Sequence, residues 1–113
     1  MARLSTHVLD TSRGAPVEGL VIDLHACVEG QRRHLKADAT DANGRLLLAD
    51  ELPPGVYELT FHAGDYFRAA GVALAGPPFL DEVVVRFGVA DPSGNYHVPL
   101  LLSPYGYSTY RGS

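Results

Sequence analysis

Apolar and polar side chains alternate with a period of two in four parts of the chain: residues 20–28, 57–62, 83–89 and 96–102. Successive side chains of a β-strand point to opposite faces, so this period collects the apolar residues of each stretch on one face. In the first stretch, Ile22 and Leu24 fall on one face and Asp23 falls on the other. The pattern predicts four strands, each with one face turned toward a core.

Turn-forming residues separate these stretches. Residues 41–44 read Asp-Ala-Asn-Gly, residues 53–55 read Pro-Pro-Gly, and residues 91–95 read Asp-Pro-Ser-Gly-Asn. Gly, Asn and Asp tolerate the backbone conformations that tight turns require, and Pro presets one of them. One short helix is predicted over residues 65–70, with Gly64 before it and Gly71 as its C-terminal stop.

Composition supports a small β protein. The chain has 113 residues, of which 46% are hydrophobic, and it contains 12 Gly and 8 Pro. This length fits one domain, residues 1–113, and the frequent turns argue against a helical bundle. Strands spaced by roughly ten residues predict an all-β fold, a two-sheet antiparallel β-sandwich. A domain this small leaves much of its apolar surface exposed to water, and forming an oligomer would bury part of that surface.

The charge balance and the single cysteine narrow the partners and the location. Nine Lys and Arg face 13 Asp and Glu, a formal net charge of −4, and no long basic stretch is present. Nucleic acid and anionic membranes are therefore not expected as partners. Cys27 has no second cysteine with which to pair. The first residues turn polar at once and no apolar run spans a membrane, so we expect a cytoplasmic protein.

Three of the five histidines fit an ordinary surface role. His25 falls with Asp23 on the face opposite the apolar residues of its stretch, and His62 falls on a polar face with Glu58. His34 lies among basic residues. We therefore interpret His25, His34 and His62 as side chains on solvated strand faces.

His97 stands in a different context. It shares its predicted strand face with Pro99 and Leu101, so that face is apolar where water would be expected. Four of the six tyrosines lie in residues 96–113, which suits a docked strand more than a frayed end. A subunit interface over this face accounts for both observations. Metal binding by His7 and His97 remains open, but two histidines without an adjacent carboxylate or cysteine are a weak signal.

No hydrolase elbow, zinc-binding helix, phosphate loop or dinucleotide motif occurs in the sequence. Pattern and composition alone thus lead to a small oligomeric β-sandwich with a histidine-containing site. Three segments are more specific about the family: Leu-Ser-Thr-His-Val-Leu-Asp at 4–10, Asn-Gly-Arg at 43–45 and Tyr-Arg-Gly-Ser at 110–113. Together with residues 57–67 and 97–109, they resemble the transthyretin-related 5-hydroxyisourate hydrolases over nearly the entire chain.

This resemblance implies a fold, an assembly and an activity. The family's fold is an eight-stranded, two-sheet sandwich with one short helix, assembled as a homotetramer with its active sites at the dimer–dimer interface. Its members hydrolyse 5-hydroxyisourate to 2-oxo-4-hydroxy-4-carboxy-5-ureidoimidazoline in purine catabolism and use no cofactor. The small-molecule substrate is then the partner expected for this chain, beside copies of itself.

The resemblance also implies which residues act. The family's catalytic positions fall on His7, Arg45 and His97, and its substrate-binding tail falls on the final four residues, Tyr110, Arg111, Gly112 and Ser113. As a hypothesis, His7 deprotonates or orients the attacking water, and His97 positions the substrate or relays a proton. Arg45 would bind the carbonyl or the developing oxyanion. Tyr110 and Ser113 would hold the substrate ring.

Two other function classes stay open at this stage. One is a transthyretin-like protein that binds a small ligand in the same inter-subunit channel. The other is a non-catalytic sandwich module for adhesion or assembly. The Tyr-Arg-Gly-Ser ending and the polar histidine and arginine set argue against the first, and the lack of a linker or export signal argues against the second.

Overall fold

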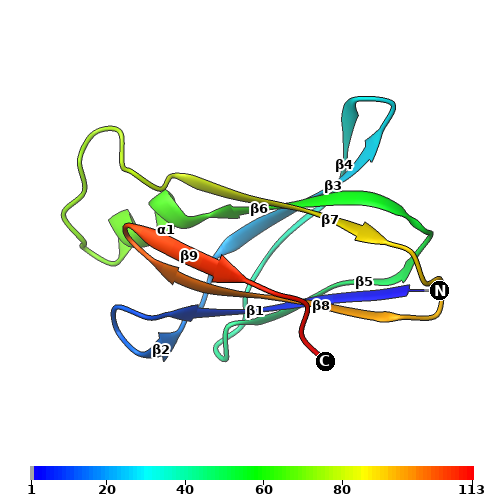
Figure 1. The fold of residues 1–113 in the computed structure, drawn as a ribbon. Helices are drawn as coiled ribbons and strands as arrows, with labels where there is room; N and C mark the ends of the chain where they lie inside the picture. The colour runs from blue at the N-terminus through cyan, green and yellow to red at the C-terminus, as the bar shows by residue number, and fades with distance from the viewer. Residues whose placement is uncertain (1) are drawn as a thin grey trace.

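The computed structural model describes residues 2–113, which form two β-sheets stacked face to face (Figure 1). The elements in chain order are β1 (Ala2–Asp10), β2 (Ala15–Pro16), β3 (Val21–Val28), β4 (Gln31–Ala39), β5 (Arg45–Leu52), β6 (Gly55–His62), α1 (Ala63–Ala69), β7 (Glu82–Val89), β8 (Asn95–Ser103) and β9 (Gly106–Thr109). Eight of these strands have four or more residues and β2 has two.

The five-stranded sheet is built around β1. One edge of β1 pairs with β8, which in turn pairs with β9, and the other edge pairs with β5 and β2. The four-stranded sheet has the order β4-β3-β6-β7. In Figure 1 the four-stranded sheet lies above the five-stranded one, and the C-terminus descends below the lower sheet. The end of the chain therefore reaches the outer face of the five-stranded sheet.

The core fills the space between the sheets. Its largest side chains without solvent exposure come from both layers and from α1, and they include Leu4, Leu59, Phe61, Phe67 and Leu100. Burying one such side chain contributes roughly 1.5–3 kcal/mol. The alternating strands therefore place their apolar residues in the core and leave the polar residues of the same strands on the outer faces.

All four predicted strands are present, as β3, β6, β7 and β8, and their apolar faces turn to the core, although Glu58 and Thr60 of β6 and Pro99 of β8 are buried as well. Three long strands were not predicted from the pattern: β1, β4 and β5. Strand β4 is exposed along most of its length, so it carries no apolar period to detect. One pair also departs from the antiparallel expectation, because β1 and β8 run parallel. The chain between them crosses through the other sheet, which permits this direction.

The helix begins two residues earlier than predicted, at Ala63, and ends at Ala69. Gly64 lies inside the helix, where its N–H donates to the carbonyl of Asp81 and a Cβ would clash with the Asp81 side chain. Gly71 adopts a φ of +81° just after the helix, as a C-terminal stop requires. Within the described residues, no helix is long and apolar enough to cross a membrane.

Candidate functional site

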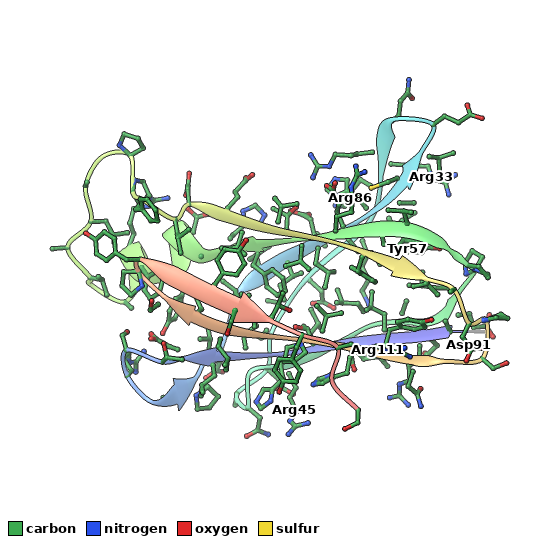
Figure 2. All side chains as sticks on the ribbon, in the orientation of Figure 1. Arg33, Arg45, Tyr57, Arg86, Asp91 and Arg111 are labelled. Atoms are coloured by element: carbon green, nitrogen blue, oxygen red, sulfur yellow. The ribbon has the colours of Figure 1, made fainter. Side chains whose placement is uncertain are left out.

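Strand register brings the predicted catalytic residues together on the outer face of the five-stranded sheet. His7 of β1 lies opposite Arg45 of β5, and Ser5 of β1 lies opposite His97 of β8. Buried neighbours on each strand point inward, so these four side chains share the outward face. Figure 2 shows Arg45 on the underside of the lower sheet, away from the core. Segments about 40 and 90 residues apart in the sequence thus meet at one place.

The turn before β5 fixes the start of that strand and hence Arg45. The Asp41 carboxylate accepts hydrogen bonds from the backbone N–H groups of Asn43 (2.9 Å) and Arg45 (3.0 Å). These bonds, that of Arg45 first, hold the pKa of Asp41 below its usual range. Gly44 has a φ of +76°, and a Cβ there would lie 2.5 Å from the carbonyl oxygen of Val8. The Asp-Ala-Asn-Gly-Arg string is therefore needed to bring Arg45 beside β1.

The His97 ring is held on two sides. On one side its Nδ1 lies 2.9 Å from Ser5 Oγ. On the other side Gly112 forms a β-bridge with His97, and its N–H donates to the His97 carbonyl at 2.8 Å. A Cβ on Gly112 would lie 2.6 Å from His97 Cδ2, a separation that real contacts do not show. Glycine in the tail thus permits the close approach that seats the imidazole.

The histidine and arginine side chains on this face form no close ion pair. Within residues 2–113, no carboxylate lies within ion-pair distance of His7, Arg45 or His97. Burial lowers the pKa of His97, and the positive charges of His7 and Arg45 lower it further. His97 is therefore neutral at neutral pH, with one ring nitrogen available as a proton acceptor.

These residues surround an open hollow of about 770 Å³, which we call the β1–β8 hollow. Three of the seven residues predicted for the site line it: Arg45, His97 and Ser113. Backbone pairing places His7 opposite Arg45 on the neighbouring strand. The remaining lining side chains include Arg3, Ser5, Asp38, Asp41 and Asn95. The hollow is large enough for a planar bicyclic small molecule and presents both charged and apolar groups to it.

Tyr110 and Arg111 lie elsewhere in the protomer. They line a second, smaller hollow of about 330 Å³ near the edge strands β7 and β9. The Arg111 guanidinium sits 4.3 Å from the ring centroid of Tyr96 and donates to the carbonyl of Asn95. Tyr110 is 60% exposed. One protomer therefore brings Ser113 to the β1–β8 hollow, pairs Gly112 with His97 beside it, and keeps Tyr110 and Arg111 outside it.

The other three histidines lie on the outer face of the four-stranded sheet. Asp23 bridges two of them, with its Oδ1 2.8 Å from His34 Nε2 and its Oδ2 2.6 Å from His62 Nε2. His25 packs edge-on against His34, with ring centroids 5.0 Å apart. Among residues 2–113, no three His, Cys, Asp or Glu side chains are grouped so that they can hold a metal ion.

Two residues at the site were not among those predicted from the sequence. Ser5 holds His97, and Asp41 organises the turn that carries Arg45. The signal for Ser5 was present in the alternation of β1, because Arg3, Ser5 and His7 are outward residues between buried ones. The partner of Ser5 could not be read from the sequence, because the parallel pairing of β1 with β8 decides it.

A two-sheet sandwich whose outer sheet face carries two histidines and an arginine defines a transthyretin-like protein with a polar site. Residues 4–112 match the model of the HIUase/Transthyretin family. The chain belongs to this family.

Relatives of both functional kinds resemble the chain. A Rhizobium meliloti (strain 1021) protein named 5-hydroxyisourate hydrolase 2 is 58% identical, over 98% of this chain and 96% of that protein. The structure of Klebsiella pneumoniae 5-hydroxyisourate hydrolase superposes with a TM-score of 0.84 at 37% identity, covering both chains completely. Transthyretin from Sparus aurata gives a TM-score of 0.86 at 27% identity, covering 96% of this chain and 95% of that one. The fold is thus shared by both groups, while sequence identity is higher to the named hydrolases.

Proposed function

We propose that this protein is a 5-hydroxyisourate hydrolase, which converts 5-hydroxyisourate to 2-oxo-4-hydroxy-4-carboxy-5-ureidoimidazoline in urate breakdown. The observation that carries the proposal is that Arg45 and His97 line the β1–β8 hollow and His7 lies opposite Arg45 on the same sheet face. The Arg45 cation beside the hollow favours a polar, electron-rich ligand, and a neutral imidazole can accept a proton. Relatives named 5-hydroxyisourate hydrolase, at 45–58% identity over essentially the whole chain, support the same activity.

The reaction follows from these groups. A water oxygen bonds to a ring carbonyl carbon while His7 orients the water and takes its proton. The Arg45 guanidinium, which stays charged at all relevant pH values, stabilises the negative charge that develops on the carbonyl oxygen. The ring C–N bond then breaks, and the proton taken by His7 passes through His97 to the leaving nitrogen, so both imidazoles return to their starting forms. The products are a ureido N–H and a carboxylic acid, which releases its proton to water as a carboxylate, so atoms and charge balance without a cofactor.

The chain end completes the site in this proposal. Ser113 reaches the hollow of its own protomer and Gly112 pairs with His97, while Tyr110 and Arg111 line the second hollow. We assign Ser113 to the substrate ring and Tyr110 and Arg111 to the walls of a site formed between subunits. The assembly is a homotetramer whose dimer–dimer interface covers the outer face of the five-stranded sheet. Exposed Leu47 (38%) and Tyr107 (45%) on this sheet support such a covering.

The transthyretin-like alternative uses the same fold to bind a ligand without reacting it. Its best support is the structural match to Sparus aurata transthyretin. Against it, the hollow holds Arg45 and His97 in place of a mainly apolar lining, and the tail glycine is fitted to the His97 ring. A carrier has no need of an imidazole fixed in this way.

The test is the decay of 5-hydroxyisourate generated in place by urate oxidase and followed in the ultraviolet. We expect the protein to accelerate the decay in proportion to its concentration. Decay at the spontaneous rate would reject the hydrolase and favour the carrier. Light scattering in the same buffer tests the tetramer, and a monomer would reject the proposed assembly.

A further inference from the structure

Ser5 is the only side chain among residues 2–113 that hydrogen-bonds the His97 imidazole, at 2.9 Å from Nδ1. It lies directly opposite His97 in the parallel β1–β8 pair and lines the hollow. The β1–β5 ladder shifts register between Leu4 and Ser5. Such irregularities often re-aim a side chain beside a functional site. Ser5 is therefore the residue whose side chain is placed to orient the His97 imidazole.

The His97 ring lies between β1 and the C-terminal tail. Nδ1 faces Ser5 on one edge, and Cδ2 faces Gly112 on the opposite edge. A five-membered ring fixed at these two edges has only its far end, Cε1 and Nε2, left open. Within the described residues the His97 ring makes its side-chain hydrogen bond through Nδ1, so Nε2 is the nitrogen available to substrate or water.

We propose that Ser5 is a positioning residue that accepts a hydrogen bond from Nδ1–H of His97, so that neutral His97 presents the Nε2 lone pair to the β1–β8 hollow. A relay alternates between neutral imidazole and imidazolium, and in the imidazolium both nitrogens are donors. A hydroxyl oxygen that accepts from Nδ1–H keeps the same bond in both states. A hydroxyl that donated to Nδ1 would have to turn around at every proton transfer.

The electrostatics of the site agree with this arrangement. Burial and the charges of His7 and Arg45 hold the pKa of His97 down, so the resting ring has one lone pair. Asp41 and Asp38 also line the hollow, while no carboxylate contacts the ring itself. A neutral acceptor at Nδ1 orients the imidazole without raising its pKa as an aspartate would. This inference rests on the proposed hydrolase activity for its kinetic consequence, but not for its structural one.

The experiment compares Ser5→Thr, which keeps the hydroxyl, with Ser5→Val, which has the same shape without it. Loss of one hydrogen bond predicts a fall in kcat of about tenfold for Ser5→Val and Ser5→Ala, with KM little changed. Ser5→Thr retains most of the activity. Ser103→Ala is the control, because its hydroxyl bonds the Gly106 carbonyl in the same sheet and not an imidazole. Equal activity of Ser5→Thr and Ser5→Val would overturn the proposal.

A second readout does not depend on activity. Long-range ¹H–¹⁵N spectra report which imidazole nitrogen carries the proton, and His97→Asn assigns the signal. We expect the Nδ1–H tautomer in the wild-type protein and in Ser5→Thr, and a mixture of tautomers in Ser5→Val. An Nε2–H tautomer in the wild type would reject the assignment. If the wild type fails to hydrolyse 5-hydroxyisourate while the Nδ1–H tautomer is found, the proposed function fails and the Ser5 contact stands.

Discussion

The two outer faces of the sandwich both carry histidine and arginine, but they treat these charges in opposite ways. On the four-stranded sheet, Asp23 binds two imidazoles and Glu58 pairs with two guanidinium groups, those of Arg32 and Arg86, each at 2.9 Å. On the five-stranded sheet, the side chains of His7, Arg45 and His97 form no ion pair within the described residues, and the nearby Asp41 carboxylate accepts from backbone N–H groups. Figure 2 places Arg86 and Arg45 on opposite sides of the molecule.

This difference separates structural charge from functional charge. A cation on the surface that pairs with a carboxylate of its own chain adds only modestly to stability, because water screens the interaction. A cation beside a hollow with no ion pair keeps its charge available to a ligand that arrives there. The pairing of each histidine and arginine, more than its presence, therefore tells the two faces apart.

The largest expected contrast is between histidines of the two faces. His7→Asn and His97→Asn should each lower kcat/KM for 5-hydroxyisourate by about 10²–10⁴-fold, because each removes a group that moves or receives a proton. His25→Asn, on the outer face of the four-stranded sheet, should leave the rate unchanged. Thermal melting checks that all three variants fold. A rate loss in His25→Asn as large as in His97→Asn would break the distinction between the faces.

A glycine exchange tests the seating of the imidazole. Gly112→Ala places a Cβ 2.6 Å from His97 Cδ2, so the ring or the tail must move, and misplacement on this scale can cost about a hundredfold in kcat. Gly88→Ala on β7 is the matched control, because its added Cβ meets nothing within 4 Å. Steady-state kinetics measure both variants. Wild-type activity in Gly112→Ala would show that the tail does not position His97.

A substitution on the outer face of the four-stranded sheet, where the charges are paired, should change stability and leave activity unchanged. Asp23→Asn removes the charge that His34 and His62 share, and we expect the free energy of unfolding to fall by about 1–2 kcal/mol. Urea denaturation at one fixed protein concentration measures this change. The rate of 5-hydroxyisourate decay should stay at its wild-type value. A slower reaction with unchanged stability would place a functional group on this face.

The smallest expected effects are in pH titrations. Burial, and then the charges of His7 and Arg45, hold the pKa of His97 below the ordinary 6.5, so Arg45→Gln should raise it in an NMR titration. A depressed imidazole pKa means that acidification through this range costs stability. The hydrogen bond from His62, with that from His34, lowers the pKa of Asp23, so its stabilisation is lost only below pH 3.8. A fall in the His97 pKa in Arg45→Gln would contradict the proposed proximity.

The sequence predicted the sandwich wherever a strand had one buried and one exposed face, as in β3 and β8. It could not reveal β4, which is exposed along most of its length, or the parallel direction of β1 against β8. The resemblance carried by the three motifs named the candidate site residues. Their contacts depend on the register between distant strands. The contact of Ser5 with His97 and the bridging of two histidines by Asp23 are therefore visible only in the three-dimensional structure.

The most direct test of the central claim makes one chemical change on each face. Arg45→Gln removes an unpaired guanidinium, and Arg86→Gln removes one that Glu58 already binds. In the urate oxidase-coupled assay, we expect Arg45→Gln to lower kcat by about 10²–10³-fold, because the developing oxyanion loses its charge partner. Arg86→Gln should match the wild type. Equal rates for the two variants, or a greater loss in Arg86→Gln, would contradict the claim that the outer face of the five-stranded sheet performs the hydrolysis.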